Sequence, residues 1–206
     1  MGHTLRVQND DEAEFVVERG VAVYGVSVAR TARCQAEGVA MRIQMELDRG
    51  YLPDAYGKYA APEDCYDWSC RRSFPFTVEG VPYGTRALAV FFIDWDSVPV
   101  CGFPWIHWCA YVNGDFEGDI EFPDDLSRNE HSRLVQGYNS AAKSEPERGV
   151  GYVGPCPPDR DHKYTLQVIA LDDEPLVEAP FWANELLDAC RGHAIDEAGR
   201  ILPSRC

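Results

Sequence analysis

Alternating apolar and polar positions mark several strands along the chain. In residues 41–47 apolar side chains recur at every second position, which is typical of a strand with one buried face. Residues 73–85 repeat this alternation and run into the turn-forming sequence EGVPYG. Residues 86–94 form a nearly continuous apolar run, which favours a strand buried on both faces. The first half of the chain therefore predicts three strands separated by turns.

The second half continues this pattern and adds one helix. Residues 106–114 predict a strand that ends at an Asn-Gly turn, and residues 163–175 predict another. Residues 181–193 place apolar side chains at helical spacing and end at Gly192, a suitable C-terminal cap. Residues 198–202 suggest a short last strand. We predict a mostly β domain, an antiparallel β-sandwich with short peripheral helices.

The regions outside these patterns are the N-terminal part and one long polar stretch. Residues 115–148 are polar and are expected to form a long loop. Residues 1–40 are assigned to an N-terminal extension of undetermined role, in which residues 21–28 have the pattern of a strand. Residues 41–206 are assigned to the folded domain, since 206 residues with 45% hydrophobic content suit one core.

Charge and hydropathy exclude some partners. The formal net charge is -15, and a field of this sign repels nucleic acids and anionic membranes. No apolar stretch reaches the roughly 20 residues that span a bilayer. The first residues are acidic and lack the basic start of a signal peptide. We therefore expect a cytoplasmic protein without nucleic-acid binding or stable membrane insertion.

Eight cysteines are many for a cytoplasmic chain. None has the C-x2-C spacing of a structural zinc site, so most are expected to be reduced, buried thiols. Cys65 and Cys70 are close in sequence, and either a bridge or a metal ligand pair remains open for them.

Asp94, Asp96 and His107 are the first candidates for chemistry. If the apolar strand continues to Asp96, both carboxylates point to one side of the sheet. His107 stands inside a predicted strand and would share a face with Trp105 and Cys109. The alternative is two acids in a surface turn and a histidine whose hydrogen bonds are satisfied in the core.

A stiff loop precedes the second group of candidates. The sequence GYVGPCPPDRDHKY, residues 151–164, contains three prolines, which restrict the backbone, and glycines, which allow close approach to a ligand. His162 and Tyr164 follow on one strand face. A rigid loop beside an imidazole and a phenol favours a small anion pocket. A rigid hairpin with capping side chains is the alternative.

These motifs carry a family resemblance. The segment GYVGPCPPDRDHKYTLQVIALD resembles the signature of the phosphatidylethanolamine-binding protein family, also called Raf kinase inhibitor-like proteins, and is most similar to bacterial members. The sequences DWDSVPVCGFPWIHW, QGYNS, GVPYGTRALAVF and GHAIDEA match further motifs, so the resemblance spans residues 41–202. It implies a β-sandwich with an anion-binding pocket at one end, and a homodimer as in bacterial members.

The resemblance also implies a set of pocket residues: Asp94, Asp96, His107, Gly154, Cys156, Pro157, His162 and Tyr164. It places Asp94 beside His107, where the carboxylate would orient the imidazole and favour its charged form. Two departures bear on the ligand. Trp95 replaces a proline of the family motif and is expected to narrow the pocket mouth, and residues 141–149 are longer than usual.

Three functions remain as hypotheses. The leading one is a non-enzymatic binding protein, without a cofactor, that holds a phosphate-bearing small molecule or a phospholipid headgroup and regulates a partner such as a kinase or a protease. The second is a hydrolase or acid–base enzyme in which Asp94, Asp96, His107 and His162 bind a divalent metal or transfer protons. The third is a protein-interaction scaffold with a closed pocket.

Overall fold

The computed structural model describes residues 40–67, 69–129, 133–144 and 149–206. The extension proposed for residues 1–40, with its strand at 21–28, therefore lies almost entirely outside the described residues. The strands are β1 (Arg42–Gln44), β2 (Cys65–Tyr66), β3 (Ser69–Cys70), β4 (Phe76–Asp94), β5 (Trp105–Phe122), β6 (Leu134–Gln136), β7 (His162–Leu171) and β8 (Ala194–Ser204). The α-helices are α1 (Val98–Cys101) and α2 (Ala183–Cys190), and three short 3-10 turns occur at Asp54–Tyr56, Pro62–Asp64 and Ser140–Lys143.

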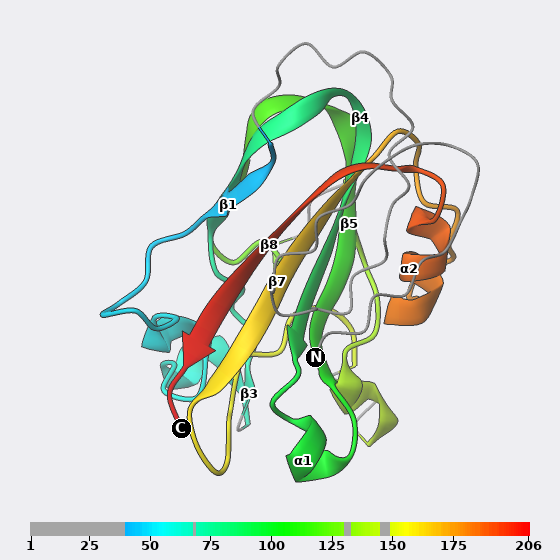
Figure 1. The fold of residues 1–206 in the computed structure, drawn as a ribbon. Coiled ribbons are helices and arrows are strands. Elements are labelled where there is room, and N and C mark those ends of the chain that lie inside the picture. Colours follow the sequence, from blue (N-terminus) through cyan, green and yellow to red (C-terminus); the bar gives the residue numbers. More distant parts are fainter. Residues whose placement is uncertain (1–39, 68, 130–132, 145–148) are drawn as a thin grey trace, which may run out of the picture. The chain divides into compact units, whose positions relative to one another are not determined.

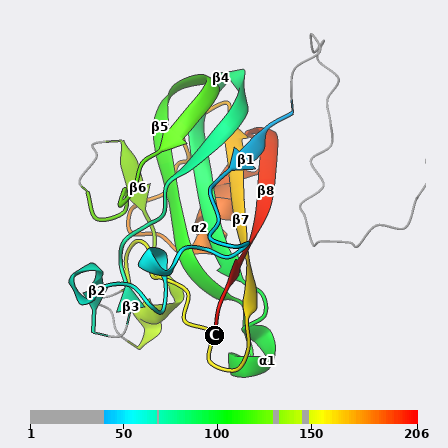
Figure 2. The same cartoon turned by 90° about the vertical axis from the view of Figure 1, so that its left-hand side faces the viewer.

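All strand pairs are antiparallel, and most belong to one sheet. Its order is β6-β5-β4-β7-β8, and β1 pairs with the first residues of β4 (Figures 1 and 2). The separate hairpin β2–β3 lies near the end of the sheet where the chain terminates (Figure 2). The mostly β, antiparallel fold class predicted from the sequence is confirmed.

The long strands β4 and β5 differ from the predicted pattern. Two strands and a turn were expected across residues 73–94, but β4 runs unbroken from Phe76 to Asp94 and stays paired with β5. Gly80 and Gly84 adopt positive φ, and register shifts on either side of Val81 make bulges, so the chain bends instead of reversing. The Asn-Gly turn predicted at 113–114 is likewise wrong, because Asn113 pairs with Ala87 inside the ladder.

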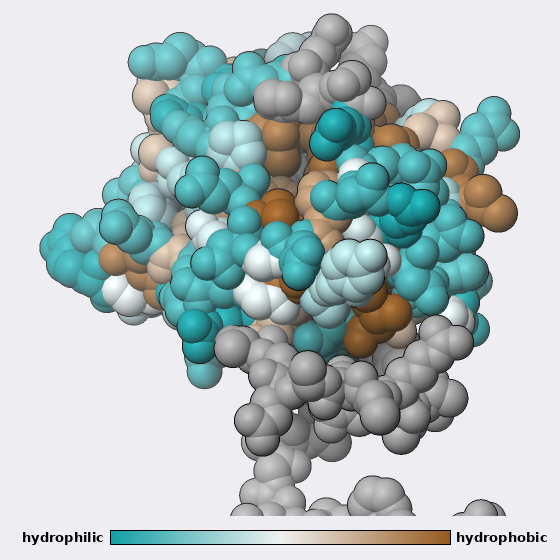
Figure 3. Space-filling model, turned by 90° about the horizontal axis from the view of Figure 1, so that it is seen from above, coloured by the Kyte–Doolittle hydropathy of each residue, from teal (hydrophilic) through white to brown (hydrophobic). Residues whose placement is uncertain are grey.

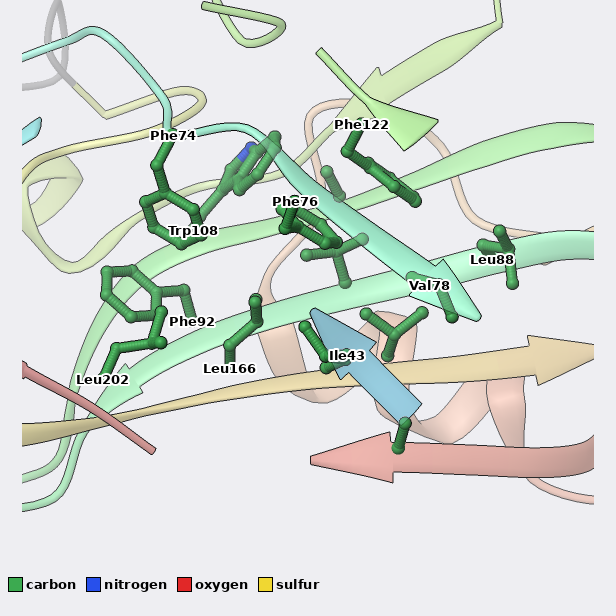
Figure 4. Close-up of a cluster of buried hydrophobic side chains, with 14 of the residues drawn as sticks. Ile43, Phe74, Phe76, Val78, Leu88, Phe92, Trp108, Phe122, Leu166 and Leu202 are labelled. Atoms are coloured by element: carbon green, nitrogen blue, oxygen red, sulfur yellow. The ribbon is translucent and has the colours of Figure 1, made fainter. Parts of the chain in front are cut away.

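The bend lets one part of the β4–β5 pair, residues 76–81 with 118–122, cover one face of the rest of the sheet. We call this part, with the paired strand β1, the outer part and the rest the inner part. Ile43 and Val78 from the outer part belong to the same buried cluster as Leu88, Phe92 and Leu166 from the inner part (Figure 4). Arg200 of β8 donates hydrogen bonds to the carbonyls of Ile43 and Met45, which fixes β1 across the sheet. The two layers therefore arise within one sheet that folds over itself.

The opposite face of the sheet is covered by α2. Leu186 and Cys190 are its buried positions, and they pack with Phe181, Tyr111 and Ile169 in a second core cluster. The helix predicted over residues 181–193 is confirmed over a shorter range. Gly192 has a φ of 83°, as its predicted role after the helix requires.

Other boundaries also changed. The predicted strand at 41–47 is limited to three residues, and the last strand extends well beyond 198–202. Residues 115–122, expected in a loop, belong to β5, and β6 lies farther along the same stretch. The polarity of residues 115–121 reflects solvent exposure, because every second side chain in this part of β5 is exposed. Seen from above, the surface is mostly hydrophilic, with smaller hydrophobic patches (Figure 3).

Among the described residues, no helix is long and apolar enough to cross a membrane.

Phe74 belongs to the first core cluster, the buried group that also contains Ile43, Val78, Leu88, Phe92 and Leu166. Its side chain is fully buried, and its ring contacts Tyr56, Phe76, Phe92 and Tyr152. We predict that Phe74→Ala lowers the free energy of unfolding by about 3–5 kcal/mol, because it leaves a cavity among these rings. Urea unfolding followed by circular dichroism measures the change.

The control is Tyr83→Ala, since Tyr83 is 85% exposed. It should change stability by less than about 0.5 kcal/mol. Equal effects of the two substitutions would contradict the assignment of this core.

Candidate ligand-binding site

Strand pairing brings the ends of three strands together. Asp94 is the last residue of β4, and its register partners are Trp105 on β5 and Tyr164 on β7. His162 is the first residue of β7. The connection from β4 to β5 contains α1 and lies at the same end of the sheet as the C-terminus (Figure 1). Most of the predicted site residues therefore lie at this end.

Asp94 forms a buried ion pair with His162, and not with His107 as the resemblance implied. Its carboxylate oxygen lies 2.7 Å from Nδ1 of His162, and the two side chains are only 5% and 1% exposed. Nε2 of His162 lies 2.9 Å from a carboxylate oxygen of Asp159. Since both ring nitrogens face acceptors, the doubly protonated imidazolium satisfies both contacts.

The pKa of His162 reflects two opposing effects. Burial alone lowers it, but the hydrogen bonds to Asp94 and Asp159 outweigh burial and raise the pKa above its ordinary value. The two carboxylates, Asp94 and Asp159, therefore favour the charged form of His162.

His107 is held in the opposite state. Its Nδ1 donates to the carbonyl oxygen of Val153 over 2.8 Å, and the Val153 N–H donates back to the carbonyl of His107 over 2.9 Å. Burial lowers the pKa of His107 to about 4, against weaker raising effects of the Val153 carbonyl and the Asp94 charge. His107 is thus neutral at pH 7, with Nε2 as its acceptor nitrogen. The expected charged form is not favoured.

A β-bulge determines the direction of the His107 side chain. Phe92 pairs with Trp108 and Ile93 with Ile106, so His107 is the extra residue between two pairs. Its ring contacts Phe92 at 5.8 Å and Tyr164 at 5.1 Å between centroids, on the side of the first core cluster. The prediction that His107 shares a face with Cys109 is wrong, because strict alternation fails at a bulge.

Asp96 has a positioning role. Because β4 ends at Asp94, the condition under which both carboxylates would share a strand face is not met. The carboxylate of Asp96 accepts from the backbone N–H of Lys163 at 2.9 Å and from Arg160 at 3.2 Å. Burial raises its pKa, but these two hydrogen bonds outweigh that effect and lower it. Asp96 therefore ties the start of β7 to the end of β4.

Sequence reasoning missed two residues that hold this end together. The Ser97 hydroxyl bonds to the carbonyls of Asp94 and Phe103 and accepts from the Trp105 N–H, which closes the connection between the two strands. Its spacing three residues after an aspartate was a usable signal for a local turn. Asp159 stands three residues before His162, and only the fold shows that the two side chains meet.

The stiff loop packs against the backbone of another segment. A Cβ atom at Gly154 would lie 2.7 Å from the carbonyl oxygen of Tyr56, so only glycine fits there. The Gly154 N–H donates to the carbonyl of Cys70 at 2.8 Å and is therefore not a free donor for an anion. The carbonyl of Pro157 accepts from Lys58.

The other predicted members lie at the same end. Tyr164 is almost fully buried, and burial together with the charge of Asp94 raises its pKa. Cys156 is partly exposed and is close enough to affect Tyr164 electrostatically.

Aromatic side chains border the site. The rings of Phe103 and Trp105 stack at 5.8 Å between centroids, and Trp105 lies 6.5 Å from His107. Trp95, which was expected to narrow the pocket mouth, is 48% exposed and makes no ring contact with any described residue. Trp105 is therefore the indole beside His107.

Two surface cavities lie outside this group of residues. One, of about 330 Å³, is lined by Val112, Phe116, Ile120, Glu121, Phe122, Pro123, Leu126, Arg133 and Leu134. The other, of about 250 Å³, is lined by Ile106, Tyr138, Asn139, Ser140, Trp182, Ala183 and Asn184. At the site itself, the side chains of Asp94, His107, His162 and Tyr164 are buried. Within the described ranges, no group of three or more His, Cys, Asp or Glu side chains has the geometry of a metal site.

Comparison with known proteins identifies the family. Residues 44–201 match the model of the phosphatidylethanolamine-binding protein family. The chain belongs to this family. It is 39% identical over 170 residues to the uncharacterized protein YxkA of Bacillus subtilis, an alignment covering 80% of this chain and 99% of the relative. A UPF0098 protein of Methanothermobacter thermautotrophicus is 30% identical over 75% of this chain and 90% of its own length.

Two crystal structures share the family fold. A putative phosphatidylethanolamine-binding protein homolog from Chlamydia trachomatis superposes with a TM-score of 0.61 and 24% identity, covering 81% of this chain and 98% of its own. YbcL of E. coli, described as a member of the mammalian family, gives a TM-score of 0.64 and 21% identity, covering 82% and 99%. At these identities the likeness supports the fold alone.

The pKa values of the two site histidines should lie on opposite sides of the ordinary value of 6.5. We predict that NMR titration of the imidazole resonances, assigned with His107→Asn and His162→Gln, finds a pKa near 4 for His107 and above 6.5 for His162.

The pH dependence of the free energy of unfolding follows from these values. The stability due to neutral His107 falls by up to about 1.4 kcal/mol per pH unit as the pH drops from 6.5 toward 4, because the unfolded state binds the proton first.

The contribution of His162 has the opposite sign. It is complete below pH 6.5 and is lost as the pH rises through the raised pKa of the folded state. Titration of His107 above 6.5 would contradict the buried neutral assignment.

Proposed function

We propose that this protein is a non-enzymatic binding protein that holds a phosphate group, either on a small molecule or on a phospholipid headgroup, at the outer edge of the Asp94, His107 and His162 site. Membership in a family named for phosphatidylethanolamine binding supports this proposal. The observation that carries it is His107, a buried and neutral imidazole that is anchored through Nδ1 to the Val153 carbonyl, with the Gly154 backbone also beside the ring. We assign Nε2 to the ligand.

The imidazolium of His162 and the guanidinium of Arg160 pair with three carboxylates, those of Asp94, Asp96 and Asp159, so one negative charge is left unbalanced. A phosphate would therefore be held by directed hydrogen bonds and not by a net positive charge of the site. Nε2 of neutral His107 accepts a hydrogen bond from the hydroxyl of a singly ionised phosphate. Proton transfer to Nε2 upon binding gives an equivalent complex, in which the imidazolium donates to the phosphate. Either form contains one proton between ring and ligand.

The hydrogen bonds of the Ser97 hydroxyl favour binding over covalent catalysis by this residue. Ser97 uses its oxygen in hydrogen bonds to Asp94, Phe103 and Trp105 backbone groups, so it is not aligned with either histidine as a nucleophile. We therefore keep the enzyme hypothesis only as the alternative.

We further propose that the protein regulates a protein partner, such as a kinase or a protease. Exposed apolar side chains stand on the connection between β4 and β5 beside the site, namely Trp95, Val98, Val100 and Phe103. A partner that contacts these side chains would be sensitive to the ligand held next to them.

Phosphate binding should depend on Nε2 of His107. We predict that inorganic phosphate and O-phosphoethanolamine bind the wild-type protein in calorimetric titrations, and that His107→Asn weakens binding by about 10- to 100-fold, the contribution of one hydrogen bond to a charged group. Asparagine retains a side-chain donor in the position of Nδ1 for the Val153 carbonyl and removes only the outer nitrogen.

The matched control is His193→Asn, because His193 is an exposed histidine that pairs with Asp172 on the surface. It should bind phosphate as the wild type does. Absence of binding at millimolar ligand, or equal binding by His107→Asn, would overturn the proposal. A preference for O-phosphoethanolamine over inorganic phosphate would point to a headgroup as the ligand.

The shared proton makes binding dependent on pH. Above the second pKa of a phosphate monoester, about 6, the dianion and the neutral imidazole are both acceptors. We predict that the affinity for O-phosphoethanolamine falls by about tenfold per pH unit above that value, as uptake of one proton requires. The same titrations in buffers of different ionisation enthalpy count the protons, and binding without proton uptake would contradict the role given to His107.

A further inference from the structure

The hairpin β2–β3 places two cysteines directly opposite each other. Cys65 pairs with Cys70, and Tyr66 pairs with Ser69. In the next pair outward, the Arg71 N–H donates to the Asp64 carbonyl at 2.8 Å. Since hydrogen-bonded and non-hydrogen-bonded pairs alternate along an antiparallel ladder, Cys65 and Cys70 form a non-hydrogen-bonded pair.

This kind of pair has the spacing that a disulfide needs. The Cα atoms of a non-hydrogen-bonded pair are about 4.5 Å apart, within the roughly 4.4–6.8 Å range of disulfides. Side chains of paired residues leave the same face of the hairpin. The two thiols also interact with each other in the reduced structure. A bridge therefore forms without moving the backbone of either strand.

We propose that Cys65 and Cys70 are a dithiol modification site that a low-molecular-weight disulfide converts into an intramolecular disulfide. Cys65 is partly exposed, whereas Cys70 is 2% exposed, so the external reagent reacts first at Cys65. The Cys65 thiolate attacks one sulfur of the reagent and releases its first thiol. The Cys70 thiolate then attacks the Cys65 sulfur and releases the second thiol.

The exchange is balanced in atoms and electrons. Two cysteine sulfurs are oxidised, one external disulfide is reduced to two thiols, and the two cysteine protons end on those thiols. The reverse exchange needs only an external dithiol, so the site is reversible.

The environment of the thiols makes the exchange slow at neutral pH. Burial, followed by the charge of Asp64, raises the pKa of Cys65, and burial raises the pKa of Cys70 to about 11. In the reduced form each thiol makes a weak hydrogen bond, Cys65 to the carbonyl of Ala60 and Cys70 to that of Ala55. The hairpin accommodates the reduced state, and higher pH accelerates its oxidation.

Cys70 also connects the hairpin to the loop that holds His107. Its carbonyl accepts from the Gly154 N–H, and a Cβ atom at Gly154 would lie 2.8 Å from the Cβ of Cys70. Val153, the residue before Gly154, holds the imidazole of His107. A bridge at Cys70 restrains the backbone against which this loop packs. The modification site itself does not depend on phosphate binding.

The test uses the full chain and oxidised glutathione. Trypsin cleaves after Lys58 and after Arg71, and therefore releases residues 59–71 as one peptide that contains both cysteines. After treatment, the remaining thiols are blocked with iodoacetamide before digestion. We expect this peptide to be unblocked and lighter by two hydrogens than its reduced form. The reaction is run at raised pH, which accelerates exchange at Cys65, and is continued well after Cys101, an exposed thiol, carries an adduct, which verifies that the reagent is active.

A Cys70→Ser variant tests the order of the two steps. The glutathione adduct at Cys65 should accumulate in this variant and be absent from the wild type at the end of the reaction. Cys101→Ser is the matched control and should leave the bridge unchanged. The proposal is overturned if the wild-type peptide carries two blocked cysteines, or a persistent adduct at Cys65, at the end of this reaction. The wild-type result alone decides this if Cys70→Ser does not fold.

Discussion

β4 is hydrogen-bonded to β5 along one edge and to β7 along the other, and this double pairing positions the site. Its last residue, Asp94, lies between Trp105 and Tyr164 because of the register of these two ladders. The same strand contributes Leu88, Val90 and Phe92 to the first core cluster. A change in register would move these apolar side chains to the wrong face and separate Asp94 from His162, so core packing and site geometry constrain each other.

The site combines two histidines in opposite states within one buried group of side chains. The charged form of His162 is favoured because the ring lies between two carboxylates, and His107 is neutral because burial is opposed only by backbone carbonyls and a more distant charge. Breaking the Asp94–His162 pair would leave an uncompensated buried charge, which is strongly unfavourable. The pair therefore supports the end of the sheet, while His107 is the side chain to which we assign the ligand contact.

The loop of residues 151–157 links this chemistry to the rest of the molecule. It holds His107 through Val153, and Gly154 contacts Tyr56 and Cys70 from the segment that precedes β4. Glycine allows this contact because any side chain would overlap with neighbouring backbone. The β2–β3 hairpin, whose two cysteines face each other, is thus in contact with the residues that orient the imidazole.

The sequence by itself determined the strand character of most of the core, the helix near residue 186 and the set of residues that gather at one end of the sheet. These features are local or follow from motif resemblance: period-two burial, a helical apolar face, and stiff Gly/Pro segments. Tertiary structure decided which histidine pairs with Asp94, because that depends on the bulge at His107 and on the register of β7. It also turned the predicted turns at residues 79–84 and 113–114 into a bend and a continuous strand, since pairing with a neighbouring strand overrides local turn preference.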